Sequence, residues 1–114
     1  MRYVLLIHDE EKTLLNLPPE QTQKIMADYM ALTAEMSECG VRQASSRLRP
    51  VTTATTVRVR DGKTLTVDGP FAETKEQLGG FYLIDVKDLD EAIRWAAKIP
   101  SAKIGSVEVR PIWE

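Results

Sequence analysis

The chain has 114 residues, of which 43% are hydrophobic and 28% are charged, and its formal net charge at pH 7 is −2. This composition is typical of a globular domain and argues against a disordered chain. Lysines and arginines are scattered along the sequence, which argues against a nucleic-acid-binding surface or a membrane-binding surface. A chain of this length predicts one domain, over residues 1–114. Cys39 is the only cysteine, so no internal disulfide forms, and we expect a cytoplasmic protein.

The first predicted element is a buried strand over residues 3–7, which are apolar throughout. Pro18 and Pro19 then predict the start of a helix, because a proline at the first helical position loses no hydrogen bond. Apolar residues recur after them at helical spacing, and Gly40 suits the left-handed end of a helix. We therefore expect a helix from about Glu20 to Cys39.

A weak strand over residues 41–46 precedes a predicted β-hairpin over residues 55–67. The apolar side chains of this hairpin are Val57, Val59, Leu65 and Val67. A three-residue loop, 60–62, would place all four on one face, whereas a two-residue loop would place the valines of the first strand with threonines of the second. The sequence therefore favours the three-residue loop, with Gly62 in the left-handed region and a bulge.

The second half of the chain predicts a strand over residues 80–86, a helix, and a last strand over residues 106–112. Asp88 caps this helix with Glu91 as its capping-box partner, and Pro100 ends it. The order of elements is that of a split βαβ unit, so the predicted fold is α+β, ferredoxin-like, with an added β-hairpin. Two helices cover only one face of such a sheet. We expect a second copy of the chain to cover the other face, in a homodimer packed sheet to sheet.

One stretch carries a family likeness. The run Asp68-Gly69-Pro70-Phe71, followed by Glu73, Lys75 and the Gly79-Gly80-Phe81 start of a strand, resembles the DGPF proteins of the YciI-related family. The resemblance covers nearly the whole chain and implies a dimeric α+β barrel built from two ferredoxin-like halves. This barrel resembles the architecture of muconolactone isomerases and of cofactor-free monooxygenases. Some members are encoded beside extracytoplasmic-function sigma factors, which implies a regulatory link by association.

The candidate site lies at the end of the first strand. Antiparallel pairing with residues 80–86 would place His8 beside the segment 68–78. His8 is the only histidine, and histidine exchanges protons near neutral pH. The resemblance implies a His–Asp pair, with His8 as the acid or base and Asp68 as the carboxylate that orients it. The predicted ligand-binding residues are Phe71, Glu73, Phe81 and Tyr82.

Structural explanations stay open beside these roles, since the Asp68–Phe71 run also suits a plain turn. One histidine and one cysteine give no metal-ligand spacing, and we expect neither a metal nor a cofactor. Two functions remain open. The first is a cofactor-free enzyme that uses His8 and Asp68 on a small organic molecule. The alternative is a non-catalytic ligand-binding or regulatory interaction module linked to sigma-factor systems. A closed apolar cleft with His8 at its floor would favour the enzyme, and a shallow groove with His8 in solvent would favour the module.

Overall fold

The computed structural model describes residues 1–114 and contains a four-stranded antiparallel sheet in the order β2-β5-β1-β6. The strands are β1 (Arg2–Asp9), β2 (Arg42–Arg47), β5 (Gln77–Asp85) and β6 (Ser106–Pro111). With a helix between β1 and β2 and another between β5 and β6, this is the split βαβ arrangement. The predicted α+β, ferredoxin-like fold with an added hairpin is confirmed.

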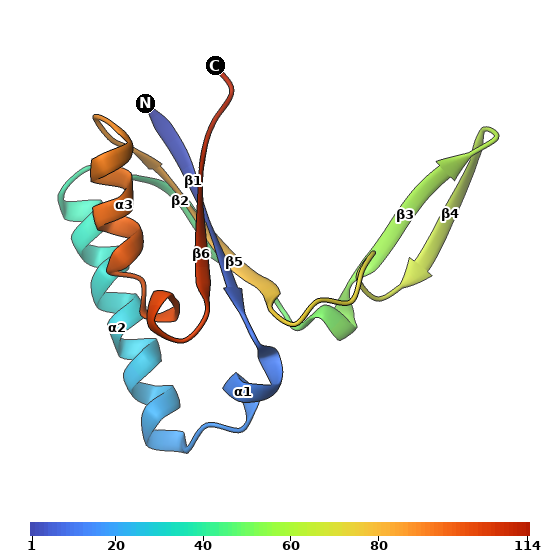
Figure 1. Ribbon diagram of the computed structural model, residues 1–114, viewed down its shortest axis with the longest axis horizontal. Helices are drawn as coiled ribbons and strands as arrows, with labels where there is room; N and C mark the ends of the chain where they lie inside the picture. Colours follow the sequence, from blue (N-terminus) through green and yellow to red (C-terminus); the bar gives the residue numbers. More distant parts are fainter.

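Two helices, α2 (Pro19–Glu38) and α3 (Leu89–Ala97), lie side by side on one face of the sheet (Figure 1). The ends of α2 follow the sequence signals, because it starts at a proline and Gly40 after it has a φ of 73°. Short turns complete the chain: α1 (Glu11–Leu15), η1 (Val51–Thr53) and η2 (Pro100–Lys103). None of the helices has the length and apolar character needed to cross a membrane.

The predicted Asp88 cap of α3 is confirmed, while its partner Glu91 bonds one residue earlier than predicted. The Asp88 carboxylate accepts a hydrogen bond from the Glu91 backbone N–H at 3.0 Å. In return, the Glu91 carboxylate accepts one from the Lys87 backbone N–H, also at 3.0 Å. The bond to Asp88 satisfies a backbone donor that the first turn of a helix otherwise leaves without a partner, which fixes where α3 begins. Glu91 bonds to Lys87, the residue before the cap, rather than to the Asp88 N–H as in a regular capping box.

The core lies between the sheet and the two helices. Its buried hydrophobic residues are Tyr3, Leu5, Ile7, Leu32, Met36, Val41, Tyr82, Ile84, Val86, Ala92, Trp95, Ala96 and Ile99. Burial alternates along β1, so that every second residue from Tyr3 to Asp9 is buried and the residues between them are partly buried. The apolar run at the start of the chain therefore has two distinct faces, and His8 and Asp9 lie on opposite sides of the sheet.

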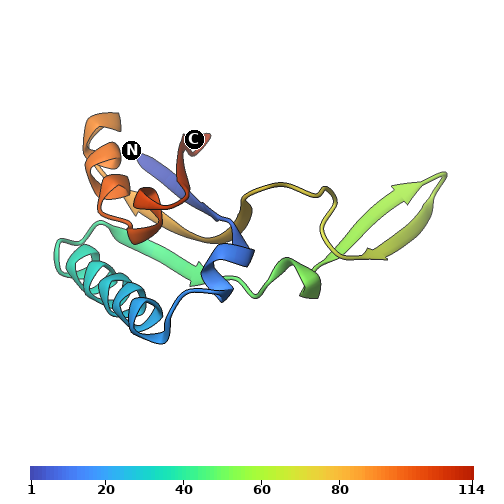
Figure 2. The same cartoon turned by 60° about the horizontal axis from the view of Figure 1, so that its bottom comes forward.

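The hairpin of β3 (Thr55–Arg60) and β4 (Lys63–Asp68) pairs only with itself and projects away from the sheet (Figure 1, Figure 2). We call residues 55–68 the hairpin arm. Arg60 pairs with Lys63, so the loop is the two residues Asp61 and Gly62, with φ of 52° and 73°. Positive φ at both positions is the pattern of a type I′ turn.

The predicted three-residue loop is therefore wrong, while the left-handed conformation of Gly62 is confirmed. The prediction assumed that one face of the hairpin is buried, which would favour gathering the four apolar side chains there. In one chain Val57, Val59, Leu65 and Val67 are all exposed. Burial therefore does not select the register, and the Asp-Gly turn sets it.

Candidate functional site

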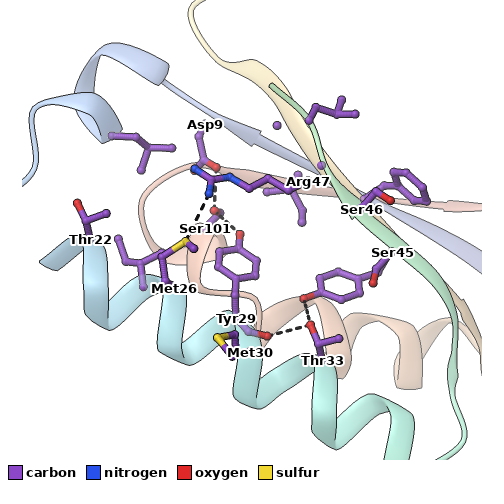
Figure 3. A pocket seen from close by; sticks show the side chains of 18 of the residues that line it. Asp9, Thr22, Met26, Tyr29, Met30, Thr33, Ser45, Ser46, Arg47 and Ser101 are labelled. Carbon is purple, nitrogen blue, oxygen red and sulfur yellow. Dashed lines mark hydrogen bonds between the residues drawn. The ribbon is translucent and has the colours of Figure 1, made fainter. Parts of the chain in front are cut away.

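A cleft of about 870 Å³ lies on the helix side of the sheet, at the end of β1 (Figure 3). The elements that contribute to it are β1, α1, α2, β2, β5 and η2. Its apolar lining residues include Leu14, Leu17, Ile25, Met26 and Met30. The exposed fraction is 43% for Met26 and 71% for Met30, so this wall is open to solvent. The size and lining are those of a site for a small organic molecule.

Asp9 is the buried carboxyl group of this cleft. It is the last residue of β1, it lines the cleft, and its exposed fraction is 6%. The Ser101 hydroxyl donates a hydrogen bond to its Oδ2 at 2.8 Å, whereas Oδ1 has no hydrogen-bond partner. A buried carboxylate normally accepts several hydrogen bonds, so Asp9 is poorly stabilised as an anion.

Tyr29 extends this contact into a chain of three side chains from α2, η2 and β1. Its hydroxyl lies 2.6 Å from the Ser101 hydroxyl (Figure 3). Because Ser101 has a single hydroxyl proton and donates it to Asp9, Tyr29 must be the donor to Ser101. Both hydrogen bonds therefore run toward the carboxyl group.

The two ends of this hydrogen-bonded series, Asp9 and Tyr29, differ in how they titrate. Burial raises the pKa of Asp9, and the negative charge of Glu76 raises it further. The hydrogen bond from Ser101 and the charge of His8 oppose this rise. Burial also raises the pKa of Tyr29, so the phenol keeps its proton near neutral pH. Asp9 is thus the titrating member of the chain, and Tyr29 is a fixed donor.

The local backbone around Asp9 depends on Gly105. A Cβ atom at this position would lie 2.2 Å from the His8 carbonyl oxygen and 2.8 Å from Asp9 Oδ1. The Gly105 N–H also donates to the Ser101 carbonyl oxygen at 2.6 Å, which closes the η2 turn beside the strand end. A glycine here lets the turn approach β1 closely enough for Ser101 to reach Asp9.

A second pair of hydroxyls lies further along the cleft. Thr33 donates to the Tyr29 carbonyl oxygen at 2.9 Å, and its oxygen lies 2.8 Å from the Tyr82 hydroxyl. Since the proton of Thr33 is already used, Tyr82 donates to Thr33. Tyr82 is therefore held against α2 by a bond within the protein.

The structure separates the predicted pair of catalytic residues. His8 is partly buried on the sheet face opposite the helices. Asp68 is exposed at the last position of β4, at the base of the hairpin arm. No hydrogen bond or ion pair joins them in one chain. Neither residue lines the cleft. Asp9 lines the cleft in place of His8. The structure therefore has neither a closed cleft with His8 at its floor nor a shallow groove with His8 in solvent.

The predicted ligand-binding residues also divide. Phe71, 80% exposed, and Glu73, also exposed, do not line the cleft. Phe81 and Tyr82 do line it. Alternation along β5 puts the buried side chain of Tyr82 on the helix side. Phe81 borders the cleft only as its neighbour in the strand, because its side chain belongs to the other face, where Phe81 pairs with Leu6. The segment 68–78 reaches β1 only at its end, where Gln77 and Leu78 pair with Asp9 and His8.

Sequence reasoning missed Asp9, Ser101 and Tyr29. The sequence held only part of the signal for Asp9: alternation groups residue 9 with Tyr3, Leu5 and Ile7, but the apolar run does not show that this face is the buried one. Ser101 gave no comparable signal, since it lies 92 positions from Asp9 in the sequence. The chain has no group of three or more His, Cys, Asp or Glu side chains that could hold a metal ion.

Comparison with known proteins gives a relative and a fold neighbour. An uncharacterised protein of Rhizobium meliloti is 42% identical over 114 residues, which cover 98% of this chain and 92% of the relative. A solved structure of the 5-chloro-2-hydroxyhydroquinone dehydrochlorinase from Burkholderia phenoliruptrix, in complex with 2,5-dihydroxybenzoquinone, has a TM-score of 0.50. It is 15% identical, and the match covers 100% of this chain and 94% of that one. This likeness shows the fold. The model of the YCII-related domain matches residues 1–114, and the chain therefore belongs to the YCII-related family.

Proposed function

We propose that this protein is a cofactor-free enzyme in which Asp9 exchanges a proton with a small organic molecule held in the cleft. The observation that carries this proposal is a carboxyl group, 6% exposed, that lines an apolar cleft and has one oxygen without a partner. A carboxyl group whose pKa is raised by burial in a cleft is typical of a general acid or base.

The surroundings of Asp9 suit both of its protonation states. Burial favours the neutral acid, which can give a proton to a ligand. The hydrogen bond from Ser101, itself supported by Tyr29, stabilises the carboxylate that remains. Burial therefore brings the two states closer in free energy, at pH values above 3.8, than they are in an exposed carboxyl group, and the hydrogen bond from Ser101 limits this effect.

Deuterium uptake from heavy water tests this role. The substrates are small unsaturated and carbonyl-containing carboxylic acids, and the uptake is followed by nuclear magnetic resonance. We expect Asp9→Asn to slow the exchange by about a hundredfold or more, the usual contribution of a general acid or base. Asp68→Asn is the matched control, because it makes the same change at the exposed carboxylate of the hairpin arm. Loss of exchange in Asp68→Asn, with retention in Asp9→Asn, would favour the His8–Asp68 pair.

The pair predicted from sequence stays a prediction of its own. No hydrogen bond or ion pair joins His8 and Asp68 in one chain, so the pair would form through the arm of a second copy or through a movement of the arm. A fall in exchange in both Asp68→Asn and His8→Gln would support that arrangement.

The second function left open by the sequence is a ligand-binding module without catalysis. One observation favours it: Glu11, the other carboxylate of the cleft, accepts a hydrogen bond from the Val51 backbone N–H at 3.0 Å. Glu11 makes no hydrogen bond to Asp9, so the two carboxyl groups do not form an acid–base pair. If Asp9→Asn binds ligands as the native protein does and neither protein exchanges protons, the module is the better description.

We also propose that two copies pack together through the outer face of the sheet. Val4, Leu6, Phe81 and Leu83 are apolar and only partly buried, and pairing of β1 with β5 places them together on the face without helices. Analytical ultracentrifugation should give a dimer, and Leu6→Glu should give a folded monomer. A monomeric native protein would contradict the proposal.

A further inference from the structure

We propose that the ligand of the cleft is a small apolar carboxylic acid whose carboxylate binds Arg47. The inference rests on the proposed use of the cleft and adds the chemical class of its ligand. Arg47 is the last residue of β2 and lines the cleft on the side of α2 (Figure 3). A guanidinium group carries five N–H donors in a fork that matches a carboxylate, so this residue is suited to an anionic ligand.

Arg47 has no anionic partner within the protein. It is absent from all five ion pairs of the chain. Its only side-chain hydrogen bond runs from Nη1 to the sulfur of Met26 at 3.5 Å. A thioether sulfur is a weak acceptor, so most of the donor capacity of the guanidinium is unused. The contact places the exposed guanidinium beside Met26, which lines the cleft.

The other charged residues of the cleft leave Arg47 free to bind a ligand. They are Asp9 and Glu11, and neither pairs with it. Glu11 is bonded to the backbone of Val51, and Asp9 is bonded to Ser101. Arg47 is thus the single cation of a cleft whose walls are apolar. The charge of a ligand carboxylate would be matched by the guanidinium, and its apolar body would lie against Met26 and Met30.

Arg47 is therefore a specificity residue rather than a source of protons. A carboxylic acid should bind more tightly than the amide of the same shape, because only the acid forms a charge-assisted pair with the guanidinium. An anion bound in the cleft would also disfavour ionisation of Asp9, which keeps that residue in the form that donates a proton.

The test uses benzoate and benzamide as probes of equal shape and different charge. Binding is followed by the methyl resonances of the four methionines. Met26 and Met30 line the cleft and should shift, while the fully buried Met36 serves as an internal reference. We expect benzoate to bind about tenfold more tightly than benzamide, the typical effect of one hydrogen-bonded charge pair.

Variants of arginine assign the preference to one residue. Arg47→Met should abolish the preference for benzoate, and Arg47→Lys should retain part of it, since lysine keeps the charge without the fork. Arg49→Met is the charge-matched control, because Arg49 is exposed like Arg47 but lies outside the cleft, and it should behave as the native protein does. Equal binding of the two probes, no shift at Met26 and Met30, or a preference that survives Arg47→Met would overturn the inference.

The deuterium-uptake assay keeps this inference separate from the proposed function. A benzoate preference that depends on Arg47, together with proton exchange that Asp9→Asn leaves unchanged, would reject only the catalytic role. Exchange that depends on Asp9, together with equal affinity for acid and amide, would reject only the role of Arg47.

Discussion

The Ser101 hydroxyl donates a hydrogen bond to Oδ2 of Asp9, 2.8 Å away, although the two residues lie 92 positions apart in the sequence. This contact joins η2 to the end of β1, and Tyr29 adds α2 to the same network. The same three side chains therefore hold three elements together and set the proton affinity of the carboxyl group. Changes in this network should alter stability and pKa together.

Ser101→Ala should destabilise the fold by about 1–3 kcal/mol, the usual cost of leaving buried polar groups without partners. The variant removes the donor to Asp9 and the acceptor of Tyr29 at once. It should also raise the pKa of Asp9 further, because the hydrogen bond from Ser101 lowers it. Urea denaturation measures the first effect. Ser106→Ala, at an exposed serine bonded to Glu76, is the control, and equal stability of the two variants would contradict the prediction.

The stability of the native protein should fall relative to that of Asp9→Asn as the pH rises. Burial puts the pKa of Asp9 in the folded chain above its ordinary value of 3.8, so the folded state holds the proton more tightly than the unfolded state does. Well below pH 3.8 Asp9 is protonated in both states, and its ionisation contributes nothing to the free energy of unfolding. As the pH rises toward the raised pKa of the folded state, this contribution becomes increasingly unfavourable. Above that pKa it is constant. Urea denaturation across this range measures it, and a native protein that gains on the variant would contradict the assignment.

Gly105→Ala should cost about 1–3 kcal/mol or more, because its Cβ would lie 2.2 Å from the His8 carbonyl oxygen and force the η2 turn away from β1. Gly79→Ala is the matched control at the same end of β1. Its Cβ would meet nothing closer than 4.0 Å. Thermal unfolding of the two variants checks the difference, and similar losses in both would show that close approach at Gly105 does not matter.

Replacing residues 56–67 of the hairpin arm by a short Gly-Ser turn should leave the four-stranded sheet and its core intact. The arm contributes no residue to the buried core and pairs only with itself. Shortening a connection changes its closure free energy little, so we expect a loss of about 1 kcal/mol or less. Circular dichroism and urea denaturation check this. Loss of cooperative unfolding would mean that the four-stranded sheet and its core depend on the hairpin arm.

The sequence predicted those parts of the structure that local signals specify. The proline start of α2, the left-handed Gly40 and the Asp88 cap of α3 are each determined by a few neighbouring residues. The pairing of β1 with β5 followed from the order of elements. The hairpin register could not be predicted by a burial argument, because the hairpin is not buried in one chain.

The candidate site was harder to predict, since its members meet only in the folded chain. Because residues 3–7 of β1 are all apolar, the sequence does not show which face of the strand the helices cover. It therefore does not distinguish the positions of His8 and Asp9. His8 attracted attention because histidine titrates near neutral pH without help. A carboxyl group moves toward that range only when its surroundings raise its pKa, and the burial that raises the pKa of Asp9 depends on η2 and α2.

The most direct test of the central claim is a titration of the Asp9 carboxyl carbon by nuclear magnetic resonance, with the signal assigned through Asp9→Asn. If Asp9 is the buried acid of the cleft, its midpoint lies above the ordinary value of 3.8 and rises further in Ser101→Ala. A midpoint at or below that value, unchanged by the loss of Ser101, would contradict the account.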